Sequence, residues 1–444
     1  MSEDTVFALS SPVGGAIAIV RITGSGAYAA LGRVFRCKNA PEHRVMNYGH
    51  VIDPESGETI DSAMACFLKA PATYTGEDMA EIYIHGSRVI AKRTLSVLSR
   101  FLRPAEGGEF TKRAFMNGKL DLSQAEAVMD VISSVTEQGA RMAEEQLAGS
   151  IGSGIKDIED RLIDILSGVE AALDYPDELE EDTVSALGSE LAPIIDKLDY
   201  LIRGGNAARI FREGASVAIL GAPNAGKSSL FNALMGTERA IVTSIPGTTR
   251  DTLEETLDIC GAPVRITDTA GIREGADEAE RIGVERARKA GERADLILIA
   301  IDGTKPIDEE SRALIAAANR GEYKKCILIF TKADKQGFGT DESCAEFAPI
   351  SISSVTGEGI EELKERMAAL LLTKEAESAL VTNSRHIHAL AEAKAALETA
   401  DAAMGTDLAA ADIRTALYAL GQITGREVTA DVIERIFSRF CVGK

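Results

Sequence analysis

The sequence predicts a multidomain α/β and α protein, with an α+β domain at the N-terminus and a phosphate-loop α/β domain inserted into a helical domain. Residues 1–118 mix short strand-like and helix-like runs, whereas apolar residues at three-to-four spacing dominate 119–210 and 374–444. A phosphate-loop motif and fully apolar, strand-like runs lie within 214–372. The two helical blocks flank this module, and inserted domains usually have neighbouring termini. We therefore expect three domains: 1–118, 119–210 plus 374–444, and 214–372.

Composition limits the class of protein. The 444 residues include 69 acidic and 48 basic residues, for a net charge of −21. Overall charge therefore does not favour nucleic acid, and any RNA would need a local basic patch or a basic partner. The 6 cysteines have no C-x-x-C spacing, which argues against a zinc site or a disulfide framework. The opening Ser2-Glu3-Asp4 is unlike a signal peptide and no apolar run approaches a membrane span, so we expect a cytoplasmic protein.

In the N-terminal domain, apolar runs that follow turn residues predict strands at 16–22, 63–68 and 80–85. Apolar residues at helical spacing predict a helix over 87–102. Polar clusters such as 74–78 are explained by turn chemistry when each is taken alone.

In the first helical block, 119–210, three apolar stripes predict three helices. Ser123 and Glu126 resemble a capping box at the first of them. The acidic stretch 174–182 is expected to be a solvated connection, because its carboxylates lack regular ligand spacing. Gly204 and Gly205 are expected to mark a boundary.

The stretch 221–229, Gly-Ala-Pro-Asn-Ala-Gly-Lys-Ser-Ser, fits G-x-x-x-x-G-K-[ST] and lies between a strand-like and a helix-like run. Its glycines allow backbone N–H groups to turn toward phosphate oxygens. Lys227 can neutralise the outer phosphates and the Ser228 hydroxyl can hold Mg²⁺. The helix N-terminus adds its partial positive charge. The sequence therefore predicts a nucleotide site here.

Three further signals follow strand-like runs: Asp268-Thr-Ala-Gly271, Thr331-Lys-Ala-Asp334 and 353–355, Ser-Ser-Val. Asp268 can hold Mg²⁺ through water, and Gly271 can offer its N–H to a terminal phosphate. Asp334 can accept hydrogen bonds from N1–H and the exocyclic amine of guanine, which adenine cannot supply. The signals together predict a guanine nucleotide.

The order and spacing of these motifs resemble the GTPase class of phosphate-loop proteins, with departures. Thr331 stands where that class has Asn, a loss expected to weaken guanine affinity, and 353–355 replaces S-A-K. Ile272 cannot orient the attacking water as Gln does in many small GTPases. Hydrolysis is then slow, helped in trans or arranged differently. The oxygen-rich loop 243–251 could bind a cation, whereas Glu280 taken alone is explained as a solvated charge.

The whole chain is similar to the bacterial tRNA-modification GTPase family of the TrmE type, which acts on the wobble uridine with a flavoprotein partner. The segments that carry the resemblance follow one another in the family's order. They are 11–21, 74–78, 107–115, 117–122, 174–177, 247–251 and 440–444.

The resemblance implies that the N-terminal domain dimerises and binds 5-formyl-tetrahydrofolate or methylene-tetrahydrofolate. The matching folate-binding positions are Arg21, Glu81, Lys119 and Lys444. Cations would engage the folate carboxylates, and Glu81 would accept from the pterin N–H groups. The resemblance also implies a homodimer whose GTPase domains pair and use potassium as an activating ion.

By the same matching, Mg²⁺ would be held by Ser228 and Thr249, and K⁺ by Asn224, Thr243, Ile245 and Thr248. The catalytic candidates are Lys227, Cys441 and Glu280, the last at the family's water-activating position. The remaining GTP contacts would be Ala225, Gly226, Ser229, Ser244, Pro246, Gly247, Asp268, Thr269, Ala270, Gly271, Thr331, Lys332, Asp334, Ser353, Ser354 and Val355.

The implied reaction adds a carboxymethylaminomethyl or aminomethyl group to C5 of the wobble uridine. It would occur in a heterotetramer or larger complex whose partner holds FAD and most of the tRNA. The alternative is a regulatory GTPase of ribosome assembly that binds rRNA, but such a protein should carry a basic G-x-x-G loop. The G-x-x-G at 149–152 has no basic residue. A membrane-remodelling GTPase would need a basic amphipathic helix, which the sequence lacks, and no membrane partner is expected.

Overall fold

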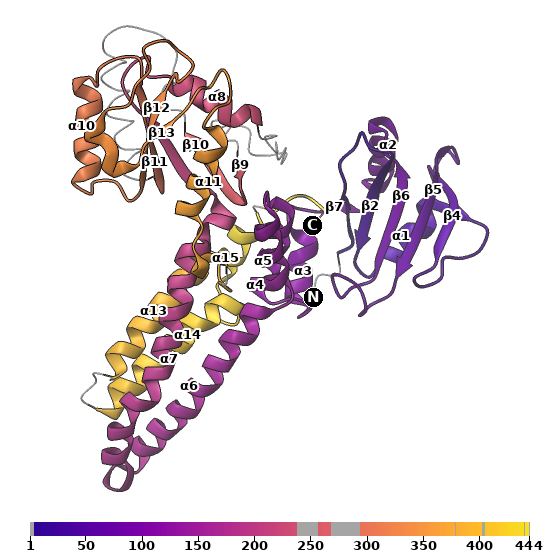
Figure 1. The fold of residues 1–444 in the computed structure, drawn as a ribbon. Coiled ribbons are helices and arrows are strands. Elements are labelled where there is room, and N and C mark those ends of the chain that lie inside the picture. The colour runs from indigo at the N-terminus through magenta and orange to yellow at the C-terminus, as the bar shows by residue number, and fades with distance from the viewer. Residues whose placement is uncertain are drawn as a thin grey trace. The chain divides into compact units, whose positions relative to one another are not determined.

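The computed structural model describes residues 4–237, 256–267, 294–377, 379–401, 405–438 and 440–443. These residues form two compact units, one of 1–129 with 421–444 and one of 130–420 (Figure 1). Within the described ranges, no helix combines the length and the apolar character that crossing a membrane requires.

The first unit is built on a seven-stranded sheet with the order β3-β4-β5-β6-β2-β1-β7. Its strands are β1 (Val6–Leu9), β2 (Ile17–Thr23), β3 (Phe35–Cys37), β4 (Met46–Ile52), β5 (Thr59–Leu68), β6 (Met79–His85) and β7 (Arg103–Pro104). Neighbours are antiparallel except for the parallel pair β1 and β7. The predicted strands and helix of this domain are found as β2, β5, β6 and the helix α2 (Arg88–Leu98).

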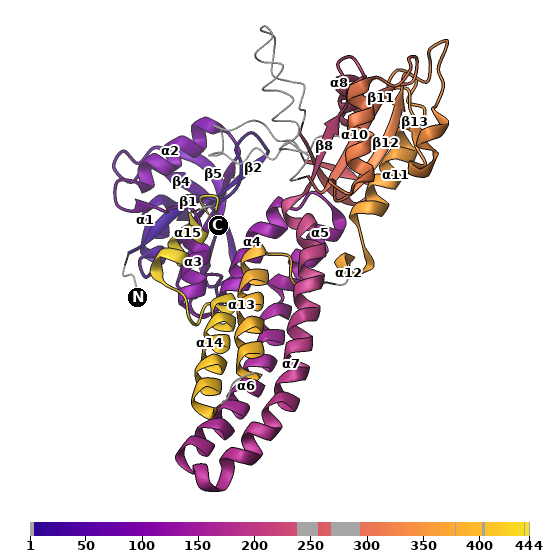
Figure 2. The same ribbon diagram turned by 90° about the vertical axis from the view of Figure 1, so that its left-hand side faces the viewer.

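Helices α1 (Ala27–Val34) and α2 pack together on one face of this sheet (Figures 1 and 2). The core between them contains alternate residues of the central strands, such as Val20 and Ile82, together with Leu31 and Val97 from the helices. Because side chains alternate along a strand, the residues between these positions face the other side of the sheet. That second side, which includes Arg21 and Glu81, is called the open face below.

The C-terminal residues return to this first unit. Helices α3 (Glu109–Met116), α4 (Leu122–Ser133) and α15 (Ala430–Phe437) share a small apolar core. Beyond α15, Val442 forms an antiparallel bridge with Gly107. A Cβ on Gly107 would lie 2.7 Å from the carbonyl oxygen of Phe440, so a larger residue would displace the tail. The structure thus groups 421–444 with the N-terminal domain, although their helical pattern continues that of 374–420.

The second unit contains α5 (Glu137–Leu147), α6 (Ser150–Asp174), α7 (Pro176–Glu213), α13 (Ser384–Asp401) and most of α14 (Thr406–Thr424). Helix α7 lies beside both α6 and α13 (Figures 1 and 2). It leads directly into the first strand of the phosphate-loop module, and α13 follows that module in the chain. Because α7 and α13 are in contact, the helices that precede and follow the module in the chain lie side by side, as expected for an inserted domain.

Two predictions in this helical region are wrong. The stretch 174–182 is not a connecting loop throughout, because α7 begins at Pro176. Proline suits the first helical turn, because its fixed φ matches the helix and its missing N–H is not needed there. Gly204 and Gly205 are not a boundary, because α7 continues through them. A Cβ on Gly205 would lie 2.9 Å from Cγ1 of Ile387, so this glycine allows α13 to approach closely.

The predicted capping box is displaced by two residues. Asp121 accepts the Gln124 N–H at 2.8 Å, and Oε1 of Gln124 accepts the Asp121 N–H at 3.0 Å. The reciprocal pair therefore forms between Asp121 and Gln124 rather than between Ser123 and Glu126.

The phosphate-loop module has a six-stranded sheet with the order β13-β12-β11-β8-β10-β9. Its strands are β8 (Ala215–Leu220), β9 (Thr256–Ile259), β10 (Ala262–Thr267), β11 (Leu296–Asp302), β12 (Cys326–Thr331) and β13 (Ile350–Ser351). All neighbours are parallel except β9, which pairs antiparallel with β10. Helices α8 (Lys227–Thr237) and α11 (Ile360–Leu371) cover one face, and α10 (Glu309–Asn319) covers the other. The short α12 (Lys374–Glu377) and a 3₁₀ turn, Glu342–Phe347, complete the module.

Candidate functional site

The phosphate loop connects the end of β8 to the start of α8. Three of its residues have positive φ: Gly221 (152°), Asn224 (63°) and Gly226 (89°). A Cβ on Gly221 would lie 2.2 Å from the carbonyl oxygen of Ala300 on the neighbouring strand, so only glycine fits there. The loop is therefore held in a turn that ends on the N–H groups of a helix N-terminus, a geometry suited to phosphate.

Lys227 stands at the first position of α8 and folds back over the loop. Its Nζ donates to the carbonyl oxygens of Gly221 at 2.6 Å and Ala222 at 2.8 Å. A bound phosphate would compete with these carbonyls for the ammonium group. The exposed hydroxyls of Ser228 and Ser229 lie in the same helical turn. An ammonium group, a hydroxyl and a helix N-terminus fit a nucleotide phosphate with its Mg²⁺.

Thr331, at the end of β12, ties the loop to the sheet. Its side chain is buried, and Oγ1 donates toward the carbonyl oxygens of Ala225 at 2.7 Å and Ile301 at 3.1 Å. A Cβ on Gly226 would lie 3.2 Å from the same hydroxyl. The Thr331 hydroxyl therefore supports the loop backbone.

Lys332 adds a second link to the loop through a charged pair. Its Nζ donates to the carbonyl oxygen of Asn224 at 2.9 Å and to Oδ2 of Asp302 at 2.6 Å. Burial of the Asp302 carboxyl would raise its pKa, but hydrogen bonds from Lys332 and Thr304 outweigh burial and lower the pKa to about 2. Asp302 was not among the residues predicted for the site. The sequence feature that could have identified Asp302 is its position directly after the apolar run 296–301.

Asp334 is oriented by the loop that follows β13. The buried Ser353 hydroxyl donates to Oδ1 of Asp334 at 2.7 Å and accepts the N–H of Thr356 at 3.1 Å. The structure thus brings three of the predicted nucleotide motifs to the carboxyl ends of parallel strands in one sheet, where ligands of α/β sheets bind.

Other predicted site residues lie outside the described residues. For the nucleotide and ion sites they are Thr243, Ser244, Ile245, Pro246, Gly247, Thr248, Thr249, Asp268, Thr269, Ala270, Gly271 and Glu280, and for the folate site Lys444.

A second group of predicted residues meets on the open face of the N-terminal sheet. Arg21 and Glu81 are paired across β2 and β6, and Nε of Arg21 donates to Oε1 of Glu81 at 2.8 Å. The Tyr83 hydroxyl donates to the other oxygen of Glu81. Burial and the adjacent Glu81 carboxylate raise the pKa of Tyr83 to about 12. Glu81 is therefore held by two donors, of which Tyr83 was not predicted.

Lys119 approaches the same domain from the segment after α3. Its Nζ donates to the carbonyl oxygen of Pro71 at 3.2 Å, and a Cβ on Gly76 would lie 3.3 Å from its Cγ. Lys119 therefore lies against the loop 69–78 that precedes β6. Tyr74 of this loop shares a hydrogen bond of 2.8 Å with Thr111, which fixes the loop to α3.

The tail carries Cys441 to the same unit. The carbonyl oxygen of Cys441 accepts the Gly108 N–H at 3.2 Å, and a Cβ on Gly443 would lie 2.8 Å from the carbonyl oxygen of Leu9. The Cys441 thiol is a free, partly exposed cysteine. Throughout the described ranges, no group of three or more His, Cys, Asp or Glu side chains is arranged to hold a metal.

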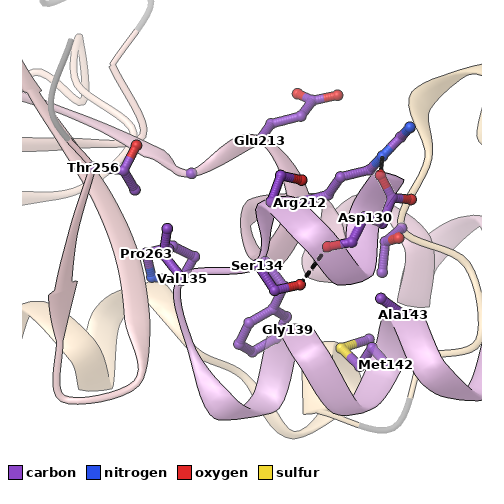
Figure 3. Close-up of a pocket in the computed structure, with 14 residues that line it drawn as sticks. Asp130, Ser134, Val135, Gly139, Met142, Ala143, Arg212, Glu213, Thr256 and Pro263 are labelled. Carbon is purple, nitrogen blue, oxygen red and sulfur yellow. Dashed lines mark hydrogen bonds and ion pairs between the residues drawn. The ribbon is translucent and has the colours of Figure 1, made fainter. Parts of the chain in front are cut away.

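A small cavity of about 60 Å³ lies where the β9–β10 hairpin faces α5 and α7 (Figure 3). Thr256 and Pro263 line it from the hairpin. On the helical side, Nε of Arg212 donates to Oδ1 of Asp130 at 2.7 Å (Figure 3). In the chain, β9 follows segment 238–255 and β10 precedes segment 268–293, which contain the predicted switch motifs. The sequence did not identify this ion pair, because it joins residues far apart in the chain.

Comparison with known proteins finds family models that match the N-terminal domain and the rest of the chain. The model of the MnmE helical domain matches residues 122–441, and the model of the GTP-binding protein TrmE N-terminus matches residues 5–119. The tRNA modification GTPase MnmE of Natranaerobius thermophilus is 39% identical over 461 residues and 100% of both chains. That of Geobacillus kaustophilus is 42% identical over 462 residues and 99% of both chains. The chain therefore belongs to the MnmE family of tRNA modification GTPases.

Proposed function

We propose that this chain is a potassium-activated GTPase that works with a FAD-dependent partner on the wobble uridine of certain tRNAs. The pair would add a carboxymethylaminomethyl or aminomethyl group to C5, with the carbon drawn from formyl- or methylene-tetrahydrofolate. We also propose that the reaction takes place in the cytoplasm, where the tRNA is. The observation that carries the proposal is the presence in one chain of a nucleotide loop and of the Arg21–Glu81–Tyr83 group on an open sheet face.

In the nucleotide site, Lys227 would exchange its contacts with Gly221 and Ala222 for phosphate oxygens. Ser228 and Thr249 would hold Mg²⁺. Asn224, Thr243, Ile245 and Thr248 would hold K⁺, which supplies positive charge near the transferring phosphate when bound. The positive φ of Asn224 places a non-glycine residue in a costly conformation, as expected at a functional turn. Glu280 would orient the attacking water, because Ile272, which follows the Asp268–Gly271 motif, has no polar group that could do so.

For the folate, we propose that Glu81 accepts hydrogen bonds from the pterin N–H groups. Arg21 and Tyr83 both donate to its carboxylate, so the acceptor is oriented before the ligand binds. Lys119 and Lys444 would engage the folate carboxylates. The partner protein would hold the FAD and most of the tRNA, which agrees with the net charge of −21 on this chain.

We propose that two copies dimerise through the open face of the N-terminal sheet. This face exposes large apolar side chains on adjacent strands, with Tyr48 67% exposed and Met64 44% exposed in a cross-strand pair. Ile17, at 60% exposure, extends the same face on β2. Adjacent exposed apolar side chains of this kind mark interaction surfaces, and a twofold dimer is the commonest way to cover them.

The test is the wobble-nucleoside composition of tRNA, measured by mass spectrometry, in cells that lack this chain. The cells are complemented with wild type or with Lys227→Ala. The proposal predicts that aminomethyl-type uridines vanish in the deletion and return only with wild type. If these nucleosides persist in the deletion, the modification proposal fails and the ribosome-assembly alternative leads.

A further inference from the structure

Three cationic side chains gather around the loop 69–73 at one end of the N-terminal sheet. Nζ of Lys119 donates to the carbonyl oxygen of Pro71 at 3.2 Å, and Nη2 of Arg44 donates to that of Ala72 at 2.9 Å. Because Pro71 and Ala72 are consecutive, the Lys119 ammonium and the Arg44 guanidinium groups both bind the same short segment of backbone. Lys69 begins this loop and is also exposed.

This cationic loop adjoins the row of the open face that contains Arg21 and Glu81. Glu81 is paired with Cys66 on β5, and Lys69 lies three residues beyond Cys66 at the strand's end. At about 3.3 Å per residue, Lys69 is about 10 Å from that row along the strand. Arg44 is fixed at the same end, because its N–H donates to the carbonyl oxygen of Phe67 at 2.8 Å.

The local conformation also favours a binding role. Arg44 has φ of 61°, in the left-handed region that costs a non-glycine residue about 1 kcal/mol. Its guanidinium group remains exposed and contacts a carbonyl oxygen. The nearby carboxylate of Asp78 accepts the Ala70 N–H at 2.8 Å and thereby closes the loop. The arrangement holds positive charge at the surface on a fixed backbone.

We propose that Arg44 and Lys69 extend Lys119 into a track for the poly-γ-glutamate tail of a reduced folate. The inference rests on the proposed folate site at Arg21 and Glu81. Each γ-linked glutamate adds one carboxylate to the tail, so a row of cations leading away from the pterin contacts matches its chemistry. Once the pterin is bound, the tail carboxylates are at high effective concentration, and weak exposed pairs then add to affinity.

The experiment compares the dissociation constants of 5-formyl-tetrahydrofolate monoglutamate and pentaglutamate by calorimetry with the full-length chain. We expect the pentaglutamate to bind about fivefold more tightly at low salt, from two exposed charge pairs. The advantage should shrink as ionic strength rises. In the double variant Arg44→Gln, Lys69→Gln, the advantage should be lost while the monoglutamate binds as in wild type.

Lys92→Gln is the matched control, because Lys92 is an exposed cation of α2 on the other face of the same sheet. It should keep the full pentaglutamate advantage. Equal affinities of the two folates in wild type, or an advantage that survives in the double variant, would overturn the tail proposal and leave the folate site standing. Failure of both folates to bind wild type would instead overturn the folate site itself, and the tail proposal with it.

Discussion

The hydroxyl of Thr331 lies 2.7 Å from the carbonyl oxygen of Ala225, which connects the end of β12 to the phosphate loop. In related GTPases an asparagine occupies the corresponding motif position, and its loss was expected to weaken guanine affinity. In this structure the Thr331 hydroxyl instead donates toward two backbone carbonyl oxygens, those of Ala225 and Ile301.

Replacing Thr331 by valine should therefore weaken nucleotide binding without changing base preference. The change keeps the shape and removes one buried hydrogen bond, worth about 1 kcal/mol, or about fivefold in affinity. Titration with fluorescent GDP and ADP analogues measures both affinity and selectivity. Thr331→Ser, which keeps the hydroxyl, should bind GDP as wild type does. A loss of guanine selectivity in the valine variant would contradict a purely supporting role.

The pairing of Asp302 with Lys332 should make the phosphate-loop module less stable in acid. The pKa of Asp302 is lowered from 3.8 to about 2, so its ionised form is favoured in the folded state. The resulting stabilisation, on the order of 1–2 kcal/mol, is present above pH 4 and is lost as the pH falls toward 2. Urea unfolding at pH 7 should show Asp302→Asn less stable than wild type by about this amount, with the difference shrinking below pH 4. A difference that is constant from pH 7 to pH 3 would contradict this linkage.

Tyr83→Phe should weaken binding of 5-formyl-tetrahydrofolate about fivefold, because Glu81 would lose one of its two donors. The pKa of Tyr83 is raised to about 12, so the hydroxyl stays protonated and able to donate well above neutral pH. Absorbance titration should accordingly show a tyrosine that ionises near pH 12 in wild type and that is missing from the variant. Tyr48→Phe on β4, two strands away in the same sheet, is the control. Unchanged folate affinity in Tyr83→Phe would show that Glu81 needs no such support.

Replacing potassium by sodium should slow GTP hydrolysis on the order of 10²-fold, if a potassium ion stabilises the transferring phosphate. Asn224→Ala should remove this ion dependence and hydrolyse slowly in both salts. Phosphate release at saturating GTP measures the rate, and GDP affinity shows whether the loop still binds nucleotide. Equal rates of the wild type in the two salts would refute potassium activation.

Several features of the fold were predictable because they depend on residues close together in the chain. The phosphate loop is the clearest case, since its glycines, Lys227 and the following helix lie within one short segment. The apolar runs that became β11 and β12 were equally visible, because strands buried on both faces need continuous apolar sequence. The helix boundaries were less so, since Pro176 starts a helix in an acidic stretch that favoured a loop.

The contacts that assemble the sites depend on pairings between distant segments. Arg21 and Glu81 are 60 residues apart and meet because of the register of β2 with β6, which periodicity does not specify. Asp302 reaches Lys332 only because β11 and β12 are neighbours in a parallel sheet. Gly205 resembles a helix breaker in the sequence, but in the fold it lies within α7 at the point where α13 packs against that helix.

The sequence by itself determined the nucleotide chemistry and the family, because local motifs carry the main-chain geometry that a phosphate requires. Only the tertiary structure decided which side chains support those motifs and where the C-terminal residues after α15 pack. The bridge from Gly107 to Val442 joins residues that are far apart in the chain, and its backbone hydrogen bonds leave no side-chain pattern in the sequence. Such pairings are selected by strand register and close packing, which are properties of the whole fold.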